Sequence, residues 1–536
     1  MRRFIILGGL MVALTLTARG VTPEVGKERL RQLLKLPAVS FQPNWGFDAG
    51  RGFTLGVGTE DAREQVAKLR KELTKDSADP ESFQDLAELY ASLNENAKAG
   101  GAWHRAAELY RRRVGSTPDD SGLLTGFGLA LAATGKSSEA ESVLRRAVRG
   151  APKNWRCWVA LGRFLDDDAR QRVLTGTTQA VELTDGTDNA GITSVGLPPN
   201  LVAQAQKELD EATDCFDKAV EVAPEEGEVY YRRGMHRSLR AMLRNQIAGT
   251  SRTDGEDPMK DYFSSESLAD LQKASRLNPT DYRMIGATAL FEVYTYGGRN
   301  GQLSWSDFSW DSLPDKSQRS LRQSITRLED LAGAPEPRVA AGALEVLGVL
   351  QGTVLRASRS SIVNLRRAVT LDPSRDQAWE LLAGTLVQSG HYDELLAACE
   401  DRVKSQGSAR SHILLAKAFE RVRQWDNAEA EIAAALSQEP DNMTACLAIA
   451  ALIMKRGHTD ASVTEAGNWL TRAELVLART PTTQRTQQLL VDFTLIRAVN
   501  FALADDLENA RRWVKAVLEE DKDNKLAQDI MAAMDY

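Results

Sequence analysis

The sequence predicts an all-α fold in which about ten helical hairpins follow one another along the chain, with loop insertions between some of them. Apolar residues recur at the i, i+3, i+4 spacing of one helix face through most of the 536 residues. Proline recurs at regular distances as well. Pro118 and Pro152 are 34 residues apart, and Pro373 and Pro440 are 67 apart, one short of two such periods. Because proline stops a helix, this recurrence indicates a repeated unit whose last helix ends at the proline.

Composition and charge exclude several classes of protein. Lys and Arg number 67 against 74 Asp and Glu, which gives a net charge of −7, whereas a nucleic-acid-binding protein carries basic stripes. Hydrophobic residues make up 43% of the chain, enough for a buried core. The cysteines form no CxxC pair and are too few for a disulfide scaffold, so we expect small buried thiols. They are Cys157, Cys215, Cys399 and Cys446.

The N-terminus has the features of a secretory signal. A basic start at Arg2 and Arg3 precedes an apolar run from Phe4 to Leu16, which is shorter than the ~20 residues of a membrane-spanning helix. Ala18 and Gly20 then supply the small residues that a signal peptidase accepts. We therefore predict a signal peptide over residues 1–20, cleavage near Gly20 and export. The alternative is a cytoplasmic regulator that retains this apolar segment.

Residues 21–79 are expected to form a leader ahead of the repeats. Pro23 is suited to the first turn of a helix and opens an amphipathic stretch, Glu24–Leu36. Residues 44–58 are glycine-rich, lack periodicity and are interpreted as a linker. A second charged helix is predicted over Glu60–Thr74.

The clearest repeat unit lies between the first two of those prolines. Its first helix has a large–x–x–large–Gly–x–x–large stripe, a turn follows at Gly135, and its second helix has an Ala–x3–large–x2–Ala stripe. The stripe residues are Leu124, Phe127, Gly128, Leu131, Ala140, Leu144 and Ala147. This pattern resembles the tetratricopeptide-repeat (TPR) family. The resemblance implies an α-solenoid, a right-handed superhelix of helical hairpins in which Gly or Ala lets paired helices approach closely.

Repeats of this kind are predicted over two stretches of the chain, residues 80–295 and residues 338–536 with a C-terminal cap. Between them, residues 296–337 are expected to hold an aromatic insertion and a helix. Three insertions interrupt the register: residues 166–200, 245–265 and 296–315.

No sequence pattern indicates catalysis, a cofactor or a metal ion. Ala130–Ser137 loosely matches a phosphate-binding loop, but it follows a helix rather than a strand, so Gly135 is better explained as a helix C-cap. There is neither an HExxH nor a GxSxG motif. Histidines in the helical stripes are expected to pack there. Asp166, Asp167 and Asp168 are interpreted as solvated carboxylates at a helix end. We predict a protein without enzymatic activity.

The resemblance to TPR proteins implies a protein–protein interaction surface in a concave groove lined by the first helix of each hairpin. The positions beside the apolar stripe are Thr125, Leu129, Val159, Arg163, Tyr231, Arg232, Met235, Ile413, Lys417, Leu447 and Ala451. This partly apolar, weakly basic set suits an amphipathic helix or an extended peptide. The leading hypothesis is an exported, non-catalytic scaffold that assembles an envelope or secretion complex with a protein partner whose identity stays open.

An aromatic cluster in the third insertion gives an alternative. Trp305, Phe308 and Trp310 lie within six positions of a chain that is only 6% aromatic. They could stack on sugar rings, which would make the protein a glycan-binding or other ligand-binding module. The preferred interpretation is that they fold back and fill the gap between interrupted repeats. The sequence leaves both open.

Overall fold

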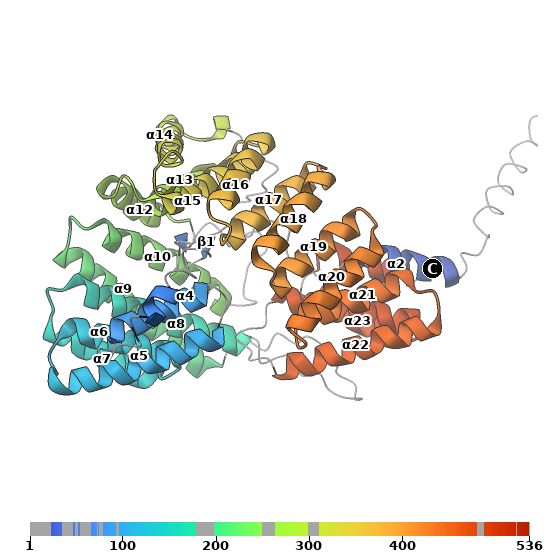
Figure 1. The fold of residues 1–536 in the computed structure, drawn as a ribbon, viewed down its shortest axis with the longest axis horizontal. Coiled ribbons are helices and arrows are strands. Elements are labelled where there is room, and N and C mark those ends of the chain that lie inside the picture. The colour runs from blue at the N-terminus through green and yellow to red at the C-terminus, as the bar shows by residue number, and fades with distance from the viewer. Residues whose placement is uncertain are drawn as a thin grey trace, which may run out of the picture. The chain divides into compact units, whose positions relative to one another are not determined.

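In the computed structural model (Figure 1), the described residues are 23–34, 47–48, 52–53, 66–71, 73, 79–92, 96–177, 198–248, 263–297, 310–479, 487–520 and 522–534. The predicted signal peptide lies outside these residues. The chain divides into two compact units. Unit 1 comprises Met1–Val39, Thr178–Val195 and Gly407–Tyr536, and unit 2 comprises Ser40–Thr177 and Gly196–Gln406.

Unit 2 is built from successive pairs of helices. In chain order the pairs are α4 (Pro80–Ser92) with α5 (Asn96–Ser116), α6 (Ser121–Ala133) with α7 (Ser137–Gly150), α8 (Trp155–Thr177) with α9 (Pro199–Val222), α10 (Gly227–Ala248) with α12 (Ser265–Leu277), α13 (Tyr282–Gly297) with α14 (Asp315–Leu331), α15 (Pro337–Val349) with α16 (Ser358–Leu371), and α17 (Asp376–Gln388) with α18 (Tyr392–Gln406). The short 3-10 helix η1 (Trp310–Ser312) precedes α14, and the π-helical segment η2 (Leu350–Val354) precedes α16.

Unit 1 contains three further pairs and two single helices. The pairs are α19 (Ala409–Arg421) with α20 (Trp425–Gln438), α21 (Met443–Arg456) with α22 (Asp460–Arg479), and α23 (Gln487–Leu503) with α24 (Leu507–Glu520). The single helices are α2 (Pro23–Leu33) and the terminal α25 (Lys525–Ala533). The described residues thus form the predicted all-α fold of about ten helical hairpins.

The pair α6/α7 shows how the sequence produces a hairpin. The Asp120 carboxylate accepts hydrogen bonds from the first backbone N–H groups of α6 and caps that helix. Gly135 follows α6 with a φ of +77°, a left-handed conformation that glycine adopts without strain, so the predicted turn is confirmed. At the helix contact, a Cβ on Gly128 would lie 2.5 Å from Cγ of Leu144. Only glycine therefore permits this close approach.

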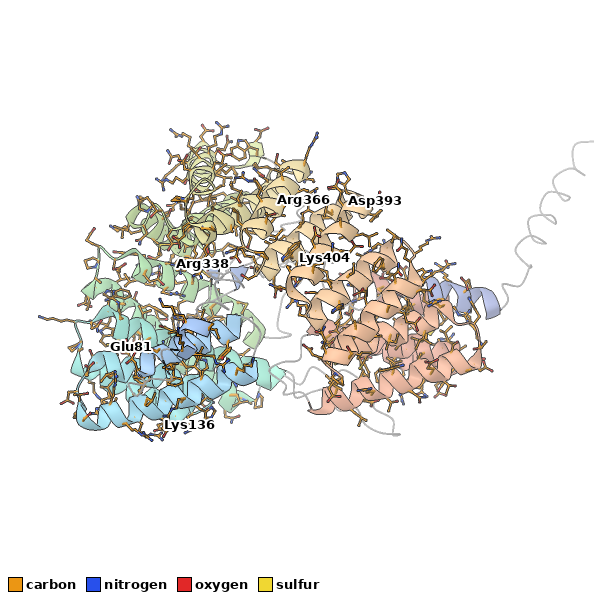
Figure 2. All side chains as sticks on the ribbon, viewed as in Figure 1. Glu81, Lys136, Arg338, Arg366, Asp393 and Lys404 are labelled. Atoms are coloured by element: carbon orange, nitrogen blue, oxygen red, sulfur yellow. The ribbon has the colours of Figure 1, made fainter. Side chains whose placement is uncertain are left out.

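Some helices run beyond the repeat pattern. α8 continues through Asp166–Asp168 to Thr177, so the first insertion begins later than predicted. The reason is that Leu165, Ala169 and Val173, four residues apart, extend the buried face of the helix. Figure 2 draws the side chains on the ribbon, and the labelled Lys136, Arg366 and Lys404 are all exposed.

The leader contains short elements. Residues 66–71 are helical and Val66 is buried, in agreement with the predicted second helix of the leader. Within the predicted linker, β1 (Phe47–Asp48) and β2 (Gly52–Phe53) form a small antiparallel ladder, and β2 lies against α13. This ladder was not predicted, because strands of two residues are too short to show a periodic pattern. None of the helices within the described ranges combines the length and the apolar character that crossing a membrane requires.

Candidate helix-binding site

The leader helix α2 lies on a surface made by three helices of unit 1. Its main neighbours are α21, α23 and α25. Figure 1 labels α2 together with α21 and α23. α21 and α23 are the first helices of their pairs, and α25 follows the last pair. We call this surface the α21–α23–α25 face. A helix from the start of the chain therefore covers the kind of helix face that the sequence predicts to bind a partner.

The sequence explains why α2 forms and which side it buries. Pro23 stands at its first position, as predicted. Gly26, Leu30 and Leu34 are buried at intervals of four residues, and the two leucines are only 2% and 4% exposed. Both belong to the apolar cluster formed by α19–α25. The opposite side of α2 is polar and exposed, so the helix is amphipathic and docks by one face.

Polar contacts fix both ends of α2 on unit 1. Near its start, Nζ of Lys27 lies 2.7 Å from Oδ1 of Asp505, just after the end of α23. At its end, Nζ of Lys455 donates a hydrogen bond of 2.8 Å to the backbone carbonyl of Leu34. The last carbonyls of a helix have no partner inside the helix, so Lys455 satisfies one of them. Lys455 also lies 3.2 Å from the carboxylate of Glu420.

A second lysine of unit 1 is buried. Lys417, on α19, is 7% exposed. Burial lowers its pKa to about 8, because removal from water disfavours the charged ammonium, while the negative charges of Glu420 and Asp492 act in the opposite direction. Part of the Lys417 population is therefore neutral slightly above neutral pH.

The predicted groove residues of unit 1 come together in one place. Ile413, Leu447 and Ala451 are buried in the same apolar cluster as Leu30 and Leu34 of α2. They are core residues in this conformation rather than open surface. The sequence identified the first-helix positions, but it gave no sign that the leader helix packs into their cluster.

The predicted groove residues of unit 2 are less uniform. Thr125 and Leu129 are half-buried, Val159 is buried and Arg163 is exposed. Farther along, Met235 and Tyr231 are buried. These residues come from α6, α8 and α10.

Tyr231 lies between two cations. Its ring centre is 5.5 Å from the Arg232 guanidinium and 5.8 Å from that of Arg283 on α13. Its hydroxyl has no hydrogen-bond partner among the residues that the structure describes. Burial raises the pKa of Tyr231, so the phenol stays protonated. Arg232 and Arg283 both pair with Glu228, and Arg283 also pairs with Asp281, so two carboxylates balance the two cations beside Tyr231.

Only one residue of the aromatic cluster can be placed. Trp310 begins η1, is half-buried and has the Arg322 guanidinium 5.2 Å from its ring centre. η1 itself lies against α13. Trp305 and Phe308 lie outside the described residues, so the choice between ligand binding and gap filling stays a prediction.

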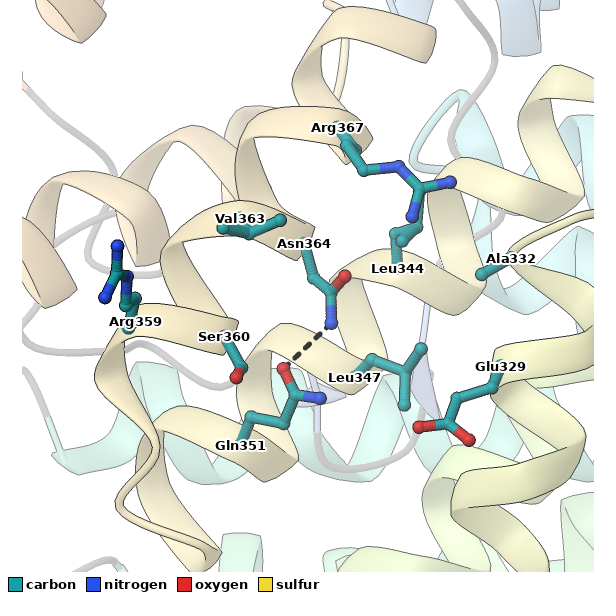
Figure 3. A pocket seen from close by; sticks show the side chains of 10 residues that line it. All are labelled: Glu329, Ala332, Leu344, Leu347, Gln351, Arg359, Ser360, Val363, Asn364 and Arg367. Carbon is teal, nitrogen blue, oxygen red and sulfur yellow. Dashed lines mark hydrogen bonds between the residues drawn. The ribbon is translucent and has the colours of Figure 1, made fainter.

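A surface depression that the sequence did not suggest lies among α14, α15 and α16 (Figure 3). Its volume is about 500 Å³, with Leu344 and Leu347 among its apolar residues and Arg359 and Arg367 among its polar ones. Nδ2 of Asn364 donates a 2.8 Å hydrogen bond to Oε1 of Gln351 there. The sequence signal was a run from Leu350 to Leu371 with four arginines and no acidic residue.

A buried polar array joins α8, α9 and α10. Nδ1 of His236 donates to Oδ1 of Asp166 at 2.7 Å, and Nε2 of His236 lies 2.8 Å from the Thr213 hydroxyl. Asp166 and His236 are 6% and 1% exposed, so the prediction of a solvated carboxylate at Asp166 was wrong.

The order carboxylate, imidazole, hydroxyl resembles a hydrolytic triad, but the hydroxyl is already engaged. Thr213 lies 2.8 Å from the Leu209 carbonyl, one turn earlier in α9, and it accepts a hydrogen bond from Arg240. We therefore interpret the array as a tie between three helices.

Two further predictions concern cysteine and metal. All four cysteines are buried and none is in a disulfide. Burial raises the pKa of Cys215 and of Cys399 to about 12, which keeps both as thiols. Within the part of the chain that the structure describes, no cluster of His, Cys, Asp or Glu could hold a metal ion.

Comparisons with known proteins give structural similarity only. No protein-family model and no curated protein matches the sequence. Among solved structures, yeast Tom70 is 14% identical, with a TM-score of 0.41 over 88% of this chain and 92% of that one. The Cut9 complex of the APC/C, solved as the Cut9–Hcn1 hetero-tetramer, is 13% identical, with a TM-score of 0.32 over 90% and 93%. YrrB, described as a TPR protein with an unusual peptide-binding site, is 14% identical, with a TM-score of 0.24 over 35% and 89%.

Because these TM-scores are low, we take nothing about function from the matches. The class follows from the fold itself. Successive helix pairs, with glycine at the closest contacts and a period of 34 residues in the regular stretches, define an all-α helical-repeat fold.

Proposed function

We propose that this chain is a non-catalytic protein-interaction scaffold that binds an amphipathic helix or peptide segment of a partner on the first helices of its hairpins. One observation carries the proposal: α2 lies on α21, α23 and α25 with its apolar face buried. Laying the apolar face of a helix into a groove is a common mode of peptide recognition. The chain thus contains an example of the binding that we assign to it.

The chemistry of the α21–α23–α25 face supports this mode. The face offers an apolar centre, a carboxylate at Asp505 and an ammonium at Lys455. An apolar centre provides affinity, while charged groups at the ends set direction and register. Such a face selects a partner helix by the order of apolar and charged side chains along it.

Export and complex assembly are part of the proposal. Arg2, Arg3 and the apolar run Phe4–Leu16 support secretion, and cleavage near Gly20 would leave α2 close to the new N-terminus. We expect N-terminal sequencing of the protein purified from its own cells to begin within a few residues after Gly20. A chain that begins at Met1 would reject export and support the cytoplasmic alternative.

Site-specific crosslinking tests the scaffold. A photo-crosslinking amino acid is placed at Arg163, exposed on the first helix α8, or at Arg149, exposed on the second helix α7 as the matched control. In the envelope fraction, we expect the Arg163 position to give crosslinks to one or two proteins, mapped by mass spectrometry, and the Arg149 position to give none of them. Equal crosslinks from both positions, or none from either, would reject the proposal.

A further inference from the structure

We infer that α2 is an exchangeable occupant of the α21–α23–α25 face, and that a partner helix with the same side-chain pattern binds there by displacing it. The pattern is a basic residue followed by leucine three and seven positions later, as in Lys27, Leu30 and Leu34. This inference rests on the proposed function and deepens it, because it names the partner's chemistry and the way the site is regulated.

The contacts of α2 define the pattern. Leu30 and Leu34 are buried in the cluster of unit 1, so a partner must supply two leucines one turn apart. Lys27 is half-buried and pairs with Asp505, so a basic residue is favoured one turn before the first leucine. A helix with an acidic residue there would meet the carboxylate of Asp505 and be disfavoured.

The end of the helix is also specified. Lys455 donates to the carbonyl of Leu34, which lies just after the last residue of α2. A carbonyl at a helix end has no partner inside the helix, whereas one in the helix interior already accepts from the residue four positions later, so the bond from Lys455 is most favourable at a helix end. The face therefore favours a helix that stops at the second leucine over one that continues past it.

The architecture of α2 makes it the part that exchanges. It has 11 residues, and isolated helices shorter than ~12–15 residues are marginal in water, so α2 is stable as a helix only when docked. Few of its side chains are buried, whereas α21 buries ten residues from Met443 to Met454. Its outer side carries Arg29 and Gln32, which are exposed while α2 is docked. Opening of α2 therefore leaves the rest of unit 1 folded.

A labelled peptide tests the exchange without any partner protein. The peptide has the sequence of residues 21–36, and its binding to the full chain is followed by fluorescence anisotropy. In the full chain, Leu30→Glu with Leu34→Glu releases α2, and Gln32→Ala on its exposed side is the control. We expect the released variant to bind the peptide at least about tenfold more tightly than the wild type or the control. In those two chains α2 occupies the site, so the apparent affinity for the peptide is reduced to the fraction of molecules in which the site is open.

Two further variants test the apolar and the polar contacts separately. A peptide that carries both Leu→Glu changes is expected not to bind. Asp505→Asn in the released chain is expected to weaken wild-type peptide binding about twofold to fivefold, the range of a partly exposed ion pair. Asparagine is chosen because residue 505 has a φ of +65°, which Asn tolerates as well as Asp does.

Equal peptide affinity for the released and control chains, with α21 still protected from hydrogen exchange, would overturn the inference. If the double glutamate variant does not fold, hydrogen exchange of the wild type decides instead. The α2 amides must then exchange faster than those of α21 and α23, and exchange at the same rate would overturn the inference. Crosslinking at Arg163 reports on the proposed function alone, so the two can fail separately.

Discussion

The hairpin α6/α7 and the helices α8–α10 use different means to hold helices together. In α6/α7 the contact is apolar, with Leu144 packed against the glycine at position 128. In α8–α10 the contact includes the buried pair of Asp166 and His236. The first hairpin keeps the 34-residue register, whereas α8 and α9 are longer than the helices of a regular repeat. The difference indicates that packing of small against large apolar residues is enough to hold helices of regular repeat length together. Where the helices are longer than the repeat, directional polar contacts also hold them.

Removing one partner of the buried pair should have the largest effect. Asp166→Ala leaves the His236 imidazole buried without its acceptor, and we expect a loss of ~3 kcal/mol in the free energy of unfolding, the upper end of the cost of an unsatisfied buried polar group. Urea unfolding of the full chain, followed by circular dichroism, measures this change.

The matched control replaces both partners. Asp166→Leu with His236→Leu should recover most of that loss, because no unpaired polar group remains. A single Asp166→Ala variant that costs less than about 1 kcal/mol, the scale of an ordinary net hydrogen bond, would show that the array does not tie the helices.

The apolar hairpin should respond to added volume. A Cβ on Gly128 would lie 2.5 Å from Leu144, so Gly128→Ala forces the helices apart, and we expect a loss of ~1–3 kcal/mol. Gly100→Ala in α5 is the control, because nothing lies within 4 Å of its added Cβ. That variant should gain ~0.5–1 kcal/mol from the better helix propensity of alanine. Equal effects of the two substitutions in thermal unfolding would reject close packing at Gly128.

Sequence reasoning predicted the hairpins well because their contacts are periodic. Gly135 and Leu144 stand at positions that a helical stripe and a turn require, and both lie where expected. Pro23 likewise predicted the start of α2. Local pattern was enough in each of these cases.

What the sequence could not predict are contacts between distant residues. The carbonyl of Leu34 and Lys455 are 421 positions apart, and Asp166 and His236 are 70 apart. No period connects them, since each depends on the way whole helices stack. The candidate site was therefore predicted as a set of first-helix positions, but its occupant was not.

The thiol of Cys215 tests whether the apolar cluster shared by α6, α7 and α9 excludes water. It lies on α9, and burial raises its pKa to about 12. Its charged form is disfavoured in the fold, so above the ordinary pKa of a cysteine the unfolded state loses its proton first, and stability falls as pH rises. We expect iodoacetamide at pH 8.5 not to label Cys215 in the folded chain, and Cys215→Ala to reduce the loss of stability above pH 9. Rapid labelling would mean that water enters beside α9.

The smallest effect is expected where the two regions meet. Arg145 on α7 pairs with Glu211 on α9, and both side chains are partly exposed, so we expect a coupling energy of ~0.2–1 kcal/mol in a double-mutant cycle. In 1 M salt, where the screening length is ~3 Å, the coupling should vanish. Arg149→Ala, at an exposed position on the same helix, should be neutral. A salt-independent coupling energy above ~1 kcal/mol would mean that the polar contacts of α8–α10 extend into the regular hairpin. The two regions would then differ only in how many polar contacts they use, not in the kind of contact.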